Sequence, residues 1–332
     1  MKPIHLKLLA ITAALVMAAP ALAANYDNYD VVFGKDQGWL FTGYEYVKPA
    51  DAKDTQTTID DLIQASKLFR QSGVGLAILI VPSKIRIYAD ELPANRPIDA
   101  YNMAQYGNAV TALRAGGVNV VDLNTPYLAM TDRLGDNLLY FHLDTHWTPK
   151  GALVAAETIK STVMSNPELK AAWAATPEVK YDLTWSARAH PSRARDLVHY
   201  LKPGTATFAP EDVKTFKVNR ATASQAGLTG AGDTVGVTVI GSSYTDAGTG
   251  YPDAVRYELQ RDVLDLSLPV DQGPWSGMAA YLKNEFKTSK PKLVIWEIPE
   301  RDLHSPPAAK WREARYQIDN AQWLQQITQE LK

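Results

Sequence analysis

The chain has 332 residues, 46% of them hydrophobic, and a formal net charge of −2. This length and apolar content allow one large domain or two ordinary domains, each with its own core. The near-neutral charge gives no sign of the clustered basic face that nucleic-acid-binding proteins use, and the absence of cysteine excludes disulfides, thiolate metal sites and a thiol nucleophile.

Residues 1–24 have the pattern of an export signal. A basic start precedes the apolar run LLAITAALVMAAPALA, which ends in the small-x-small sequence Ala21-Leu22-Ala23. A retained membrane anchor is the alternative, but the uninterrupted run is shorter than the ~20 residues of a membrane span and Pro20 breaks it. We therefore predict a signal peptide over residues 1–24, cleaved near Ala23 or Ala24, and a periplasmic mature protein.

Apolar runs and amphipathic stretches then alternate along the chain. Runs such as GLAILIVP are typical of strands buried on both faces, and stretches such as TTIDDLIQASKLFRQSG carry apolar residues at helical spacing. The expected order is helix 57–73, strand 75–82, helix 98–117, strand 118–123, strand 235–241, helix 252–261, strand 262–267, helix 275–289 and strand 292–299. This alternation predicts an α/β fold with a mostly parallel sheet covered by helices on both faces, and ligands are expected beyond the carboxyl ends of its strands.

Two segments fall outside this alternation. Residues 165–232 are less regular, and we expect them to form an insertion or cap over the sheet within one domain of residues 25–303. The tail, residues 304–332, is amphipathic and is expected to be a C-terminal helix. Packing on the core is favoured over contact with a partner.

The stretch YFHLDTHWTPKGA holds the first candidate functional residues. In an extended segment His142, Asp144 and His146 would lie on one side. They are then zinc ligands, polar residues without a role, or an Asp144–His146 pair in which the carboxylate orients a general base. A helix opening at Pro149, with Thr148 as its cap, would anchor the imidazole.

The candidate nucleophile follows the expected strand 235–241, in the sequence Gly241-Ser242-Ser243-Tyr244. Glycine allows a tight turn, and a serine at a strand's carboxyl end is placed at the mouth of the sheet. Backbone N–H groups of such a turn can hold an oxyanion. The alternative is a turn without catalytic function. The catalytic interpretation is favoured because Asp144 and His146 are expected at another strand end of the same sheet.

Seven stretches together resemble the alginate O-acetyltransferases of the AlgJ/AlgX type, a branch of the SGNH-hydrolase superfamily. They are GKDQGWLF (34–41), LIVPSKIRIYADELP (79–93), VVDLNTPYLA (120–129), YFHLDTHWTPKGA (140–152), ARDL (194–197), VIGSSYTD (239–246) and KLVIWEIPERDL (292–303). The resemblance implies a flavodoxin-like SGNH-hydrolase fold whose catalytic motifs occur in a circularly permuted order, Asp, His, then Ser.

Carried over residue by residue, the resemblance makes Asp144 the orienting carboxylate, His146 the base and Ser243 the nucleophile. His142 is then structural, and neither a metal nor another cofactor is implied. Gly273, in PVDQGPWSG, corresponds to the family's glycine-rich loop and is expected to supply a second oxyanion donor, although this loop lacks the family's arginine and consecutive glycines. Tyr244 is expected either to line the acceptor groove or to pack in the core.

The implied function is periplasmic O-acetyl transfer, through a serine ester, onto hydroxyls of a secreted polysaccharide. Alginate is one acceptor, and bacterial cellulose or another exopolysaccharide is equally compatible with the residues. The acetyl group would come from a membrane-bound donor protein of an exopolysaccharide synthesis complex. The alternatives are a carbohydrate acetylesterase with the same triad and a non-catalytic scaffold of the export complex. Lys84 and Arg86 are expected either to contact an anionic polysaccharide or to be solvated.

Overall fold

The computed structural model describes residues 30–36, 38–221, 235–268, 273–310 and 314–332. The predicted signal peptide, residues 1–24, lies outside the described residues. Within them, no helix combines the length and the apolar character that crossing a bilayer would need.

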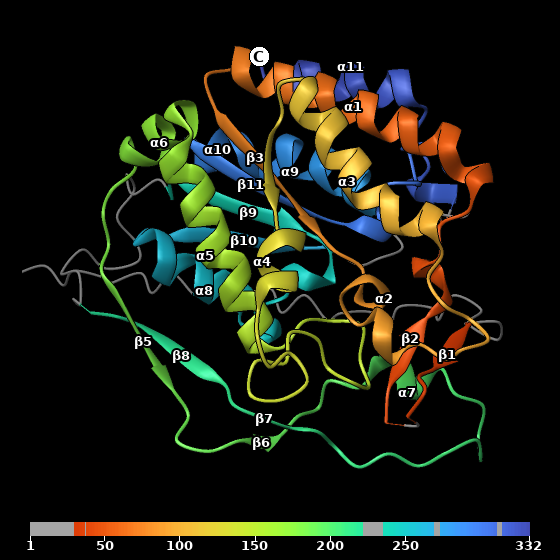
Figure 1. Ribbon diagram of the computed structural model, residues 1–332. Coiled ribbons are helices and arrows are strands. Elements are labelled where there is room, and N and C mark those ends of the chain that lie inside the picture. The colour runs from red at the N-terminus through yellow and green to blue at the C-terminus, as the bar shows by residue number, and fades with distance from the viewer. Residues whose placement is uncertain (1–29, 37, 222–234, 269–272, 311–313) are drawn as a thin grey trace, which may run out of the picture.

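A five-stranded sheet forms the centre of the molecule, and all its strands run parallel (Figure 1). Its order is β10 (Val263–Ser267), β9 (Val237–Gly241), β11 (Leu293–Pro299), β3 (Gly75–Val81) and β4 (Asn119–Asp122). Every residue of the central strands β3, β9 and β11 is buried, as the apolar runs predict. The predicted mostly parallel α/β fold is therefore confirmed.

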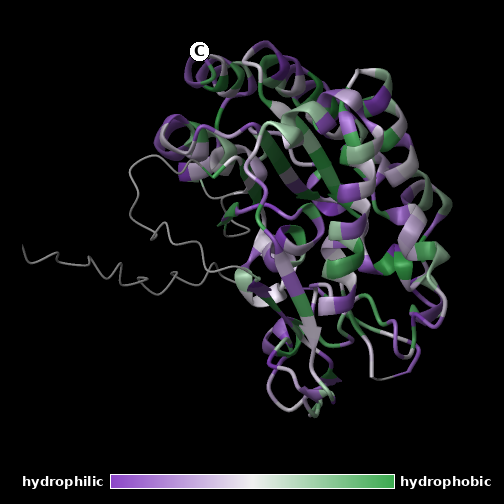
Figure 2. Cartoon of the chain, turned by 90° about the vertical axis from the view of Figure 1, so that its left-hand side faces the viewer, coloured by the Kyte–Doolittle hydropathy of each residue, from purple (hydrophilic) through white to green (hydrophobic). Residues whose placement is uncertain are grey.

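The two faces of the sheet are covered by different helices, because alternate side chains of each strand point in opposite directions. Leu79 and Ile295 face a cluster that includes α5 and α8, whereas Ile80 and Trp296 face a cluster with α1, α3, α9 and α11. Figure 2 shows the resulting hydrophobic centre, with the strands green between the two helical layers.

Helices lie at the expected periodic stretches, and four shorter helices that were not predicted, α2, α4, α6 and α7, lie between them. The helices are α1 (Ala52–Gln71), α2 (Lys84–Ile87), α3 (Ala100–Ala115), α4 (Asn124–Ala129), α5 (Pro149–Ser165), α6 (Pro167–Ala174), α7 (Asp196–His199), α8 (Tyr251–Leu259), α9 (Gly273–Tyr281), α10 (Lys287–Ser289) and α11 (Asn320–Glu330), with a π-helical turn at Leu282–Phe286. Helix α5 begins as predicted, because the Thr148 hydroxyl accepts a hydrogen bond from Gly151 N at 3.2 Å and Pro149 occupies the first turn.

The segment predicted as an insertion contains the helices α6 and α7 and two small antiparallel ladders in its described part. Strand β5 (Tyr181–Trp185) pairs with β8 (Phe216–Arg220), and β6 (His190–Pro191) pairs with β7 (Asp212–Val213). Figure 1 shows these ladders below the sheet, on the side where α5 and α8 lie. A third ladder, β1 (Val31–Phe33) with β2 (Leu40–Thr42), lies near α2 and α7.

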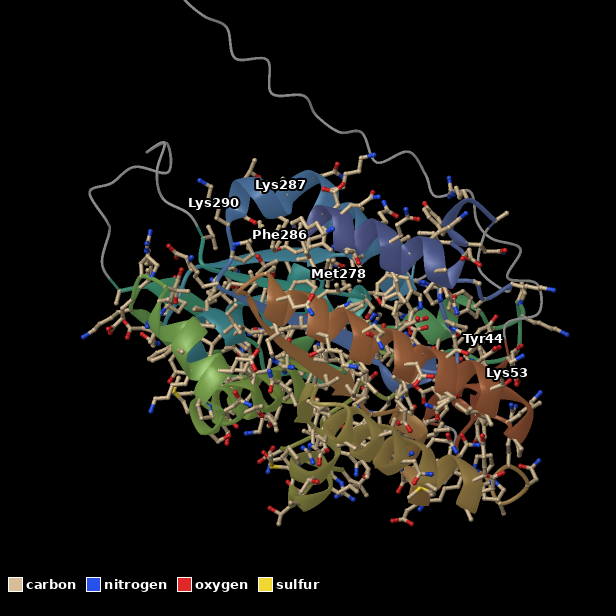
Figure 3. All side chains as sticks on the ribbon, turned by 90° about the horizontal axis from the view of Figure 1, so that it is seen from above. Tyr44, Lys53, Met278, Phe286, Lys287 and Lys290 are labelled. Carbon is tan, nitrogen blue, oxygen red and sulfur yellow. The ribbon has the colours of Figure 1, made fainter. Side chains whose placement is uncertain are left out.

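The C-terminal segment is helical over a shorter range than expected. Helix α11 occupies only Asn320–Glu330, and the described residues before it form turns. Trp323 and Ile327 are fully buried, and the Trp323 ring meets that of Trp275 at 4.9 Å between centroids. Seen from above, α11 lies alongside α1 (Figure 3). The helix therefore packs on the core.

Candidate active site

The candidate residues meet beyond the carboxyl ends of the parallel strands. Strand β9 ends at Gly241, and a 3₁₀ turn over Ser243–Thr245 follows directly. The loop 142–146 precedes α5, and Asp196 begins the short helix α7. Three segments that are distant in the sequence thus converge at one edge of the sheet.

Asp144, His146 and Ser243 form a continuous series of hydrogen bonds. Asp144 Oδ1 lies 2.6 Å from His146 Nδ1, and His146 Nε2 lies 2.7 Å from Ser243 Oγ. Asp144 is buried, while His146 and Ser243 are half-buried. This is the geometry in which a carboxylate fixes the imidazole tautomer and the imidazole can accept a proton from the hydroxyl.

The electrostatics of the pair suit that proton transfer. Burial, the largest single influence, would raise the pKa of Asp144, but the hydrogen bond and charge of His146 together with the backbone N–H donors of Asp196 and His146 outweigh it, and the pKa is lowered to about 2. Burial, the largest single influence, would lower the pKa of His146, but the hydrogen bond to Asp144 and the negative charges of Asp144 and Asp196 together exceed it, so the pKa lies above its usual 6.5. Asp144 is therefore a carboxylate throughout the neutral range, and His146 is a stronger base than free histidine.

The two adjacent serines have different partners. Ser242 Oγ donates to Glu297 Oε2 at 2.9 Å, and Ser242 N donates to the same oxygen at 2.7 Å. Ser243 Oγ instead points to His146. Glu297 lies at the end of β11 and is fully buried. It anchors the turn through Ser242 and leaves the Ser243 hydroxyl to the imidazole.

The loop that carries Asp144 and His146 is not the extended segment that its alternating pattern suggested. Residues 142–146 form a series of bends between Tyr140 and Trp147, which are joined by an isolated antiparallel bridge. The expectation of a strand was wrong because the loop is shaped by distant charged side chains rather than by a neighbouring strand.

Lys84 holds the loop 142–146 in place through hydrogen bonds to its backbone carbonyl oxygens. Its ammonium group is buried and donates to the carbonyl oxygens of Leu40 (2.6 Å), His142 (2.9 Å) and Asp144 (3.0 Å). Burial lowers the pKa of Lys84 to about 8, and the negative charge of Glu211 is the largest opposing influence. The prediction that Lys84 is solvated or contacts polysaccharide was wrong.

Arg86 is also buried, and it is paired with Glu300 at 2.6 Å. Its guanidinium therefore neutralises a buried carboxylate instead of facing solvent or polysaccharide, and the surface prediction was wrong here too.

Two carboxylates of the insertion hold the same loop from the other side, and the residue analysis assigned neither of them a role. Glu211 accepts from His142 N and Leu143 N, each at 2.8 Å. Asp196 donates its backbone N–H to Asp144 Oδ2 at 2.7 Å and accepts from Thr145 N at 2.8 Å. The only signal for Asp196 was the ARDL stretch, which carried no role by itself.

His142 turns away from the other two motif residues. Its Nδ1 lies 2.8 Å from Glu211 Oε2, and its ring meets the Trp39 ring at 4.2 Å between centroids. It does not belong to the group of possible metal ligands found among the described residues, which is Asp144, His146 and Asp196. The zinc site with His142 is therefore wrong. The 2.6 Å contact between Asp144 Oδ1 and His146 Nδ1 is a hydrogen-bond distance and leaves no space for an ion between them.

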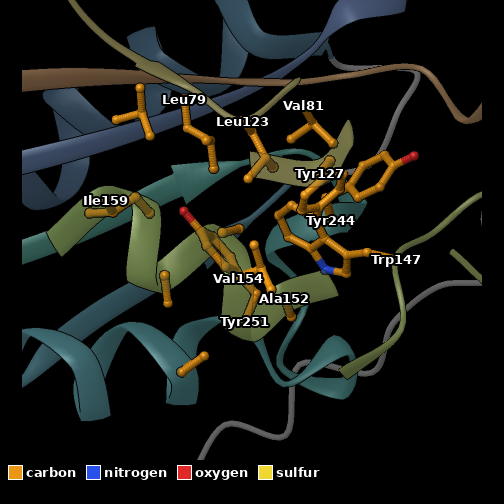
Figure 4. Close-up of a cluster of buried hydrophobic side chains, with 14 of the residues drawn as sticks. Leu79, Val81, Leu123, Tyr127, Trp147, Ala152, Val154, Ile159, Tyr244 and Tyr251 are labelled. Atoms are coloured by element: carbon orange, nitrogen blue, oxygen red, sulfur yellow. The ribbon is translucent and has the colours of Figure 1, made fainter. Parts of the chain in front are cut away.

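Tyr244 packs in the core, which is one of the two roles expected for it, and it does not line the cavity. Its side chain is 1% exposed, and its hydroxyl donates to Thr145 O at 2.5 Å. Its ring packs against Trp147 and against the imidazole of His146, each at 5.0 Å between centroids. Figure 4 shows Tyr244 and Trp147 next to each other, with Tyr251 and the α5 residues Ala152 and Val154 nearby. The aromatic cluster thus supports the imidazole from the core side.

Oxyanion donors were expected from Ser243 and Gly273. Among the described residues, the Ser243 backbone N–H has no hydrogen-bond acceptor within the chain. Gly273 is the buried first residue of α9, with a φ of 62°, and is not among the residues that line the cavity at Ser243. Ser243 N is therefore an available donor at the site, and the part of Gly273 as a second donor stays a prediction.

A cavity of about 410 Å³ opens at the Ser243 hydroxyl. Its lining includes His146, Ser243, Asp246, Gly248 and Thr249, and also residues 192–194, Val213 and Thr215 of the insertion. The volume is within the range of small-ligand sites. An acyl group or a sugar hydroxyl can therefore reach the serine from solvent.

Comparison with known proteins gives one consistent result. The family model described as "SGNH hydrolase-like domain, acetyltransferase AlgX" matches residues 31–300. The probable alginate O-acetylase AlgJ of Pseudomonas syringae pv. tomato is 30% identical over 285 residues, which cover 82% of this chain and 69% of that protein.

Two solved structures have the same fold. The O-acetyltransferase domain of Pseudomonas putida AlgJ superimposes with a TM-score of 0.73 at 25% identity, covering 91% of this chain and 99% of that domain. Pseudomonas aeruginosa AlgX superimposes with a TM-score of 0.63 at 18% identity, covering 85% of this chain and 68% of that chain.

Proposed function

This chain belongs to the family of SGNH hydrolase-like acetyltransferases to which AlgX gives its name, and from that premise we propose that it moves an acetyl group through an ester on Ser243 to hydroxyls of a secreted polysaccharide. Alginate is the first candidate acceptor, because the similar proteins are named alginate O-acetylases. The enzyme class is polysaccharide O-acetyltransferase of the SGNH type.

One observation supports the catalytic assignment above all others. His146 Nε2 lies 2.7 Å from Ser243 Oγ, while its other ring nitrogen lies 2.6 Å from a buried carboxylate. A serine hydroxyl is a weak nucleophile at neutral pH and needs an oriented base. The three residues lie in that arrangement at the rim of an open cavity.

The reaction then proceeds in two balanced halves. Ser243 Oγ attacks the acetyl carbonyl while His146 Nε2 takes its proton, and the same proton passes to the leaving group as the donor ester bond breaks. A sugar hydroxyl next gives its proton to His146 as it attacks the acetyl carbonyl of the acetyl-serine, and His146 passes that proton to Ser243 Oγ as the serine ester bond breaks, which restores the Ser243 hydroxyl. Asp144 stabilises the imidazolium in both halves, and Ser243 N–H stabilises the oxyanion.

The setting follows from the same proposal. We place the mature protein in the periplasm, after cleavage of its signal peptide. Because the periplasm has no pool of free acetyl-CoA, a membrane-bound acetyl-donor protein would deliver the acetyl group to Ser243. The polysaccharide acceptor reaches the cavity as it is exported. Neither nucleic acid nor a cofactor enters the reaction.

Detection of the acetyl-serine tests the proposal directly. The protein is exposed briefly to an activated acetyl ester, and its intact mass and its peptides are then measured. We expect a single acetyl adduct on Ser243 that is absent from Ser243→Ala. An adduct on Ser242, or none on either serine while the ester is hydrolysed, would overturn the assignment.

Acetyl transfer and simple hydrolysis are separated by adding an acceptor. We expect oligosaccharide to become acetylated at the expense of acetate release. If acetate release is the same with and without saccharide, and no acetylated sugar forms, the carbohydrate acetylesterase is the correct function. If Ser243→Ala leaves acetylation of the polysaccharide in cells unchanged, the protein is instead a non-catalytic scaffold of the export complex.

A further inference from the structure

The insertion contributes part of the lining of the cavity at Ser243, including an arginine that the chemistry above does not use. Arg193 lines the cavity together with its neighbours Ser192 and Ala194. His146 and Ser243 line the same cavity. A ligand that fills the cavity therefore lies against both the serine and Arg193.

The backbone around Arg193 is held in place on both sides. Ser192 N donates to Glu211 O at 2.7 Å, in continuation of the β6–β7 ladder, and Ala194 N donates to Ser192 Oγ at 3.1 Å. Three residues after Arg193, Asp196 N donates to Asp144 Oδ2 at 2.7 Å. Arg193 is thus carried by a segment that is hydrogen-bonded to the catalytic carboxylate itself.

The charge of Arg193 is not matched within the described residues. Its side chain is exposed and makes no ion pair, hydrogen bond or ring contact there. Arg86, by contrast, is buried and paired with Glu300 at 2.6 Å. Among the residues that line the cavity, Arg193 is the one with a permanent positive charge.

The two acidic residues that line the same cavity are already engaged. Asp144 is hydrogen-bonded to His146 and to Asp196 N, and Asp246 Oδ1 accepts from Gly248 N at 2.8 Å in its own turn. Neither forms an ion pair with Arg193. The Arg193 guanidinium is therefore available to bind an anionic group of a ligand.

We propose that Arg193 binds the carboxylate of a hexuronate unit of the acceptor chain and so selects a polyuronate over a neutral glycan. A guanidinium presents two parallel N–H donors to a carboxylate, which gives direction as well as charge to the contact. The unit held in this way lies within the cavity that contains Ser243, so its hydroxyls approach the acetyl ester. This inference rests on the proposed acetyltransferase function.

The test uses two acceptors that differ only in the carboxylate. One is an oligomannuronate of defined length, and the other is the same oligosaccharide after its carboxyl groups are reduced to primary alcohols. Acetyl transfer from an activated ester is followed for wild type, Arg193→Gln and Arg193→Lys. The matched control is Arg188→Gln, since Arg188 is an exposed arginine of the same insertion outside the cavity lining.

We expect wild type to favour the uronate, and Arg193→Gln to raise KM for the uronate by about tenfold, equivalent to about 1.4 kcal/mol. KM for the reduced acceptor should stay constant, Arg193→Lys should lose part of the preference, and Arg188→Gln should behave as wild type. An equal loss for both acceptors would instead place Arg193 at the acyl donor and overturn the inference, as would a wild type without preference.

Failure of the proposed function has a different signature. If no saccharide is acetylated by any of the proteins, transferase activity is disproved, and the affinity for oligomannuronate is then measured by calorimetry. Weaker binding by Arg193→Gln than by Arg188→Gln would still support the carboxylate site, whereas equal affinities would overturn it.

Discussion

Replacing Glu297 with glutamine is expected to stabilise the folded chain at alkaline pH and to change its stability little in acid. Glu297 is fully buried at the end of β11. Its Oε2 accepts from Ser242 N (2.7 Å), Ser242 Oγ (2.9 Å) and Thr245 Oγ1 (3.1 Å). Burial raises its pKa to about 7, and the hydrogen bonds from Ser242 oppose that rise only in part.

The size of the effect follows from the shift in pKa. A rise from the ordinary value of 4.5 to about 7 corresponds to about 3 kcal/mol, at ~1.36 kcal/mol per pH unit. Because the folded state holds this proton more tightly, the contribution to stability is complete below pH 4.5 and is lost as the pH rises through 7. Between pH 5 and pH 8.5 the wild type should therefore lose about 2–3 kcal/mol that the neutral glutamine does not lose.

Glutamine is a suitable probe because it keeps the shape of the contact. Its amide oxygen can take the place of Oε2 and accept the same three hydrogen bonds, while its NH₂ group takes the place of Oε1, 3.2 Å from the Ser242 hydroxyl oxygen. The turn that carries Ser243 should therefore keep its position. The variant removes a buried charge and little else.

The assay is denaturant-induced unfolding of wild type and Glu297→Gln at pH 5 and pH 8.5, monitored by tryptophan fluorescence. At each pH the free energy of unfolding of the wild type is subtracted from that of Glu297→Gln. The contributions of all other titrating groups cancel in this difference. Glu300→Gln is the matched control, and it should change the free energy of unfolding in the opposite direction. It leaves the buried Arg86 without its carboxylate partner and should destabilise the protein by about 3–5 kcal/mol. If Glu297→Gln differs from wild type by the same amount at both pH values, the reasoning about a buried charge fails.

Three further predictions concern the relay. Asp144→Asn should slow acylation of Ser243 by about 10³–10⁴-fold, since an amide neither fixes the tautomer nor stabilises the imidazolium; a loss below tenfold with a chromogenic ester would contradict this. The acylation rate of wild type should rise with pH through an apparent pKa above 6.5, because neutral His146 is the base and its hydrogen bond to Asp144 raises that pKa against the effect of burial; an acidic limb centred below 6.5 would refute it. Lys84→Met should lower the free energy of unfolding by about 2–4 kcal/mol and also lower the acylation rate, because three backbone carbonyls lose their charged donor; unchanged acylation in a destabilised protein would show that Lys84 does not position the loop.

The sheet and its covering helices could be predicted from local sequence alone. A run such as GLAILIV leaves no polar face, so β3 has to be buried on both sides. The periodic stretches became α1 and α3, and the Thr148-Pro149 cap began α5 where it was expected. Each of these features depends on residues within one or two turns of the chain, which is why the pattern was sufficient.

The loop 142–146 shows where such reasoning ends. Its alternating polar residues predicted an extended segment, but Lys84, Glu211 and Asp196 bend it through hydrogen bonds from three other parts of the chain. The sequence did not predict the role of any of these three residues in the loop. No local pattern identifies a lysine that is buried because its partners lie 44 to 60 residues away.

The sequence by itself determined the parallel sheet, the side of the sheet at which ligands bind, and the kinds of residue available for acyl transfer. Only the tertiary structure decided that Ser242 binds Glu297, that Tyr244 packs while Arg193 borders the cavity, and that Asp144 has a lowered pKa and Glu297 a raised one. The physical reason is that strand and helix formation depend on neighbouring residues. The direction and charge of a buried polar side chain depend on partners that only folding brings near.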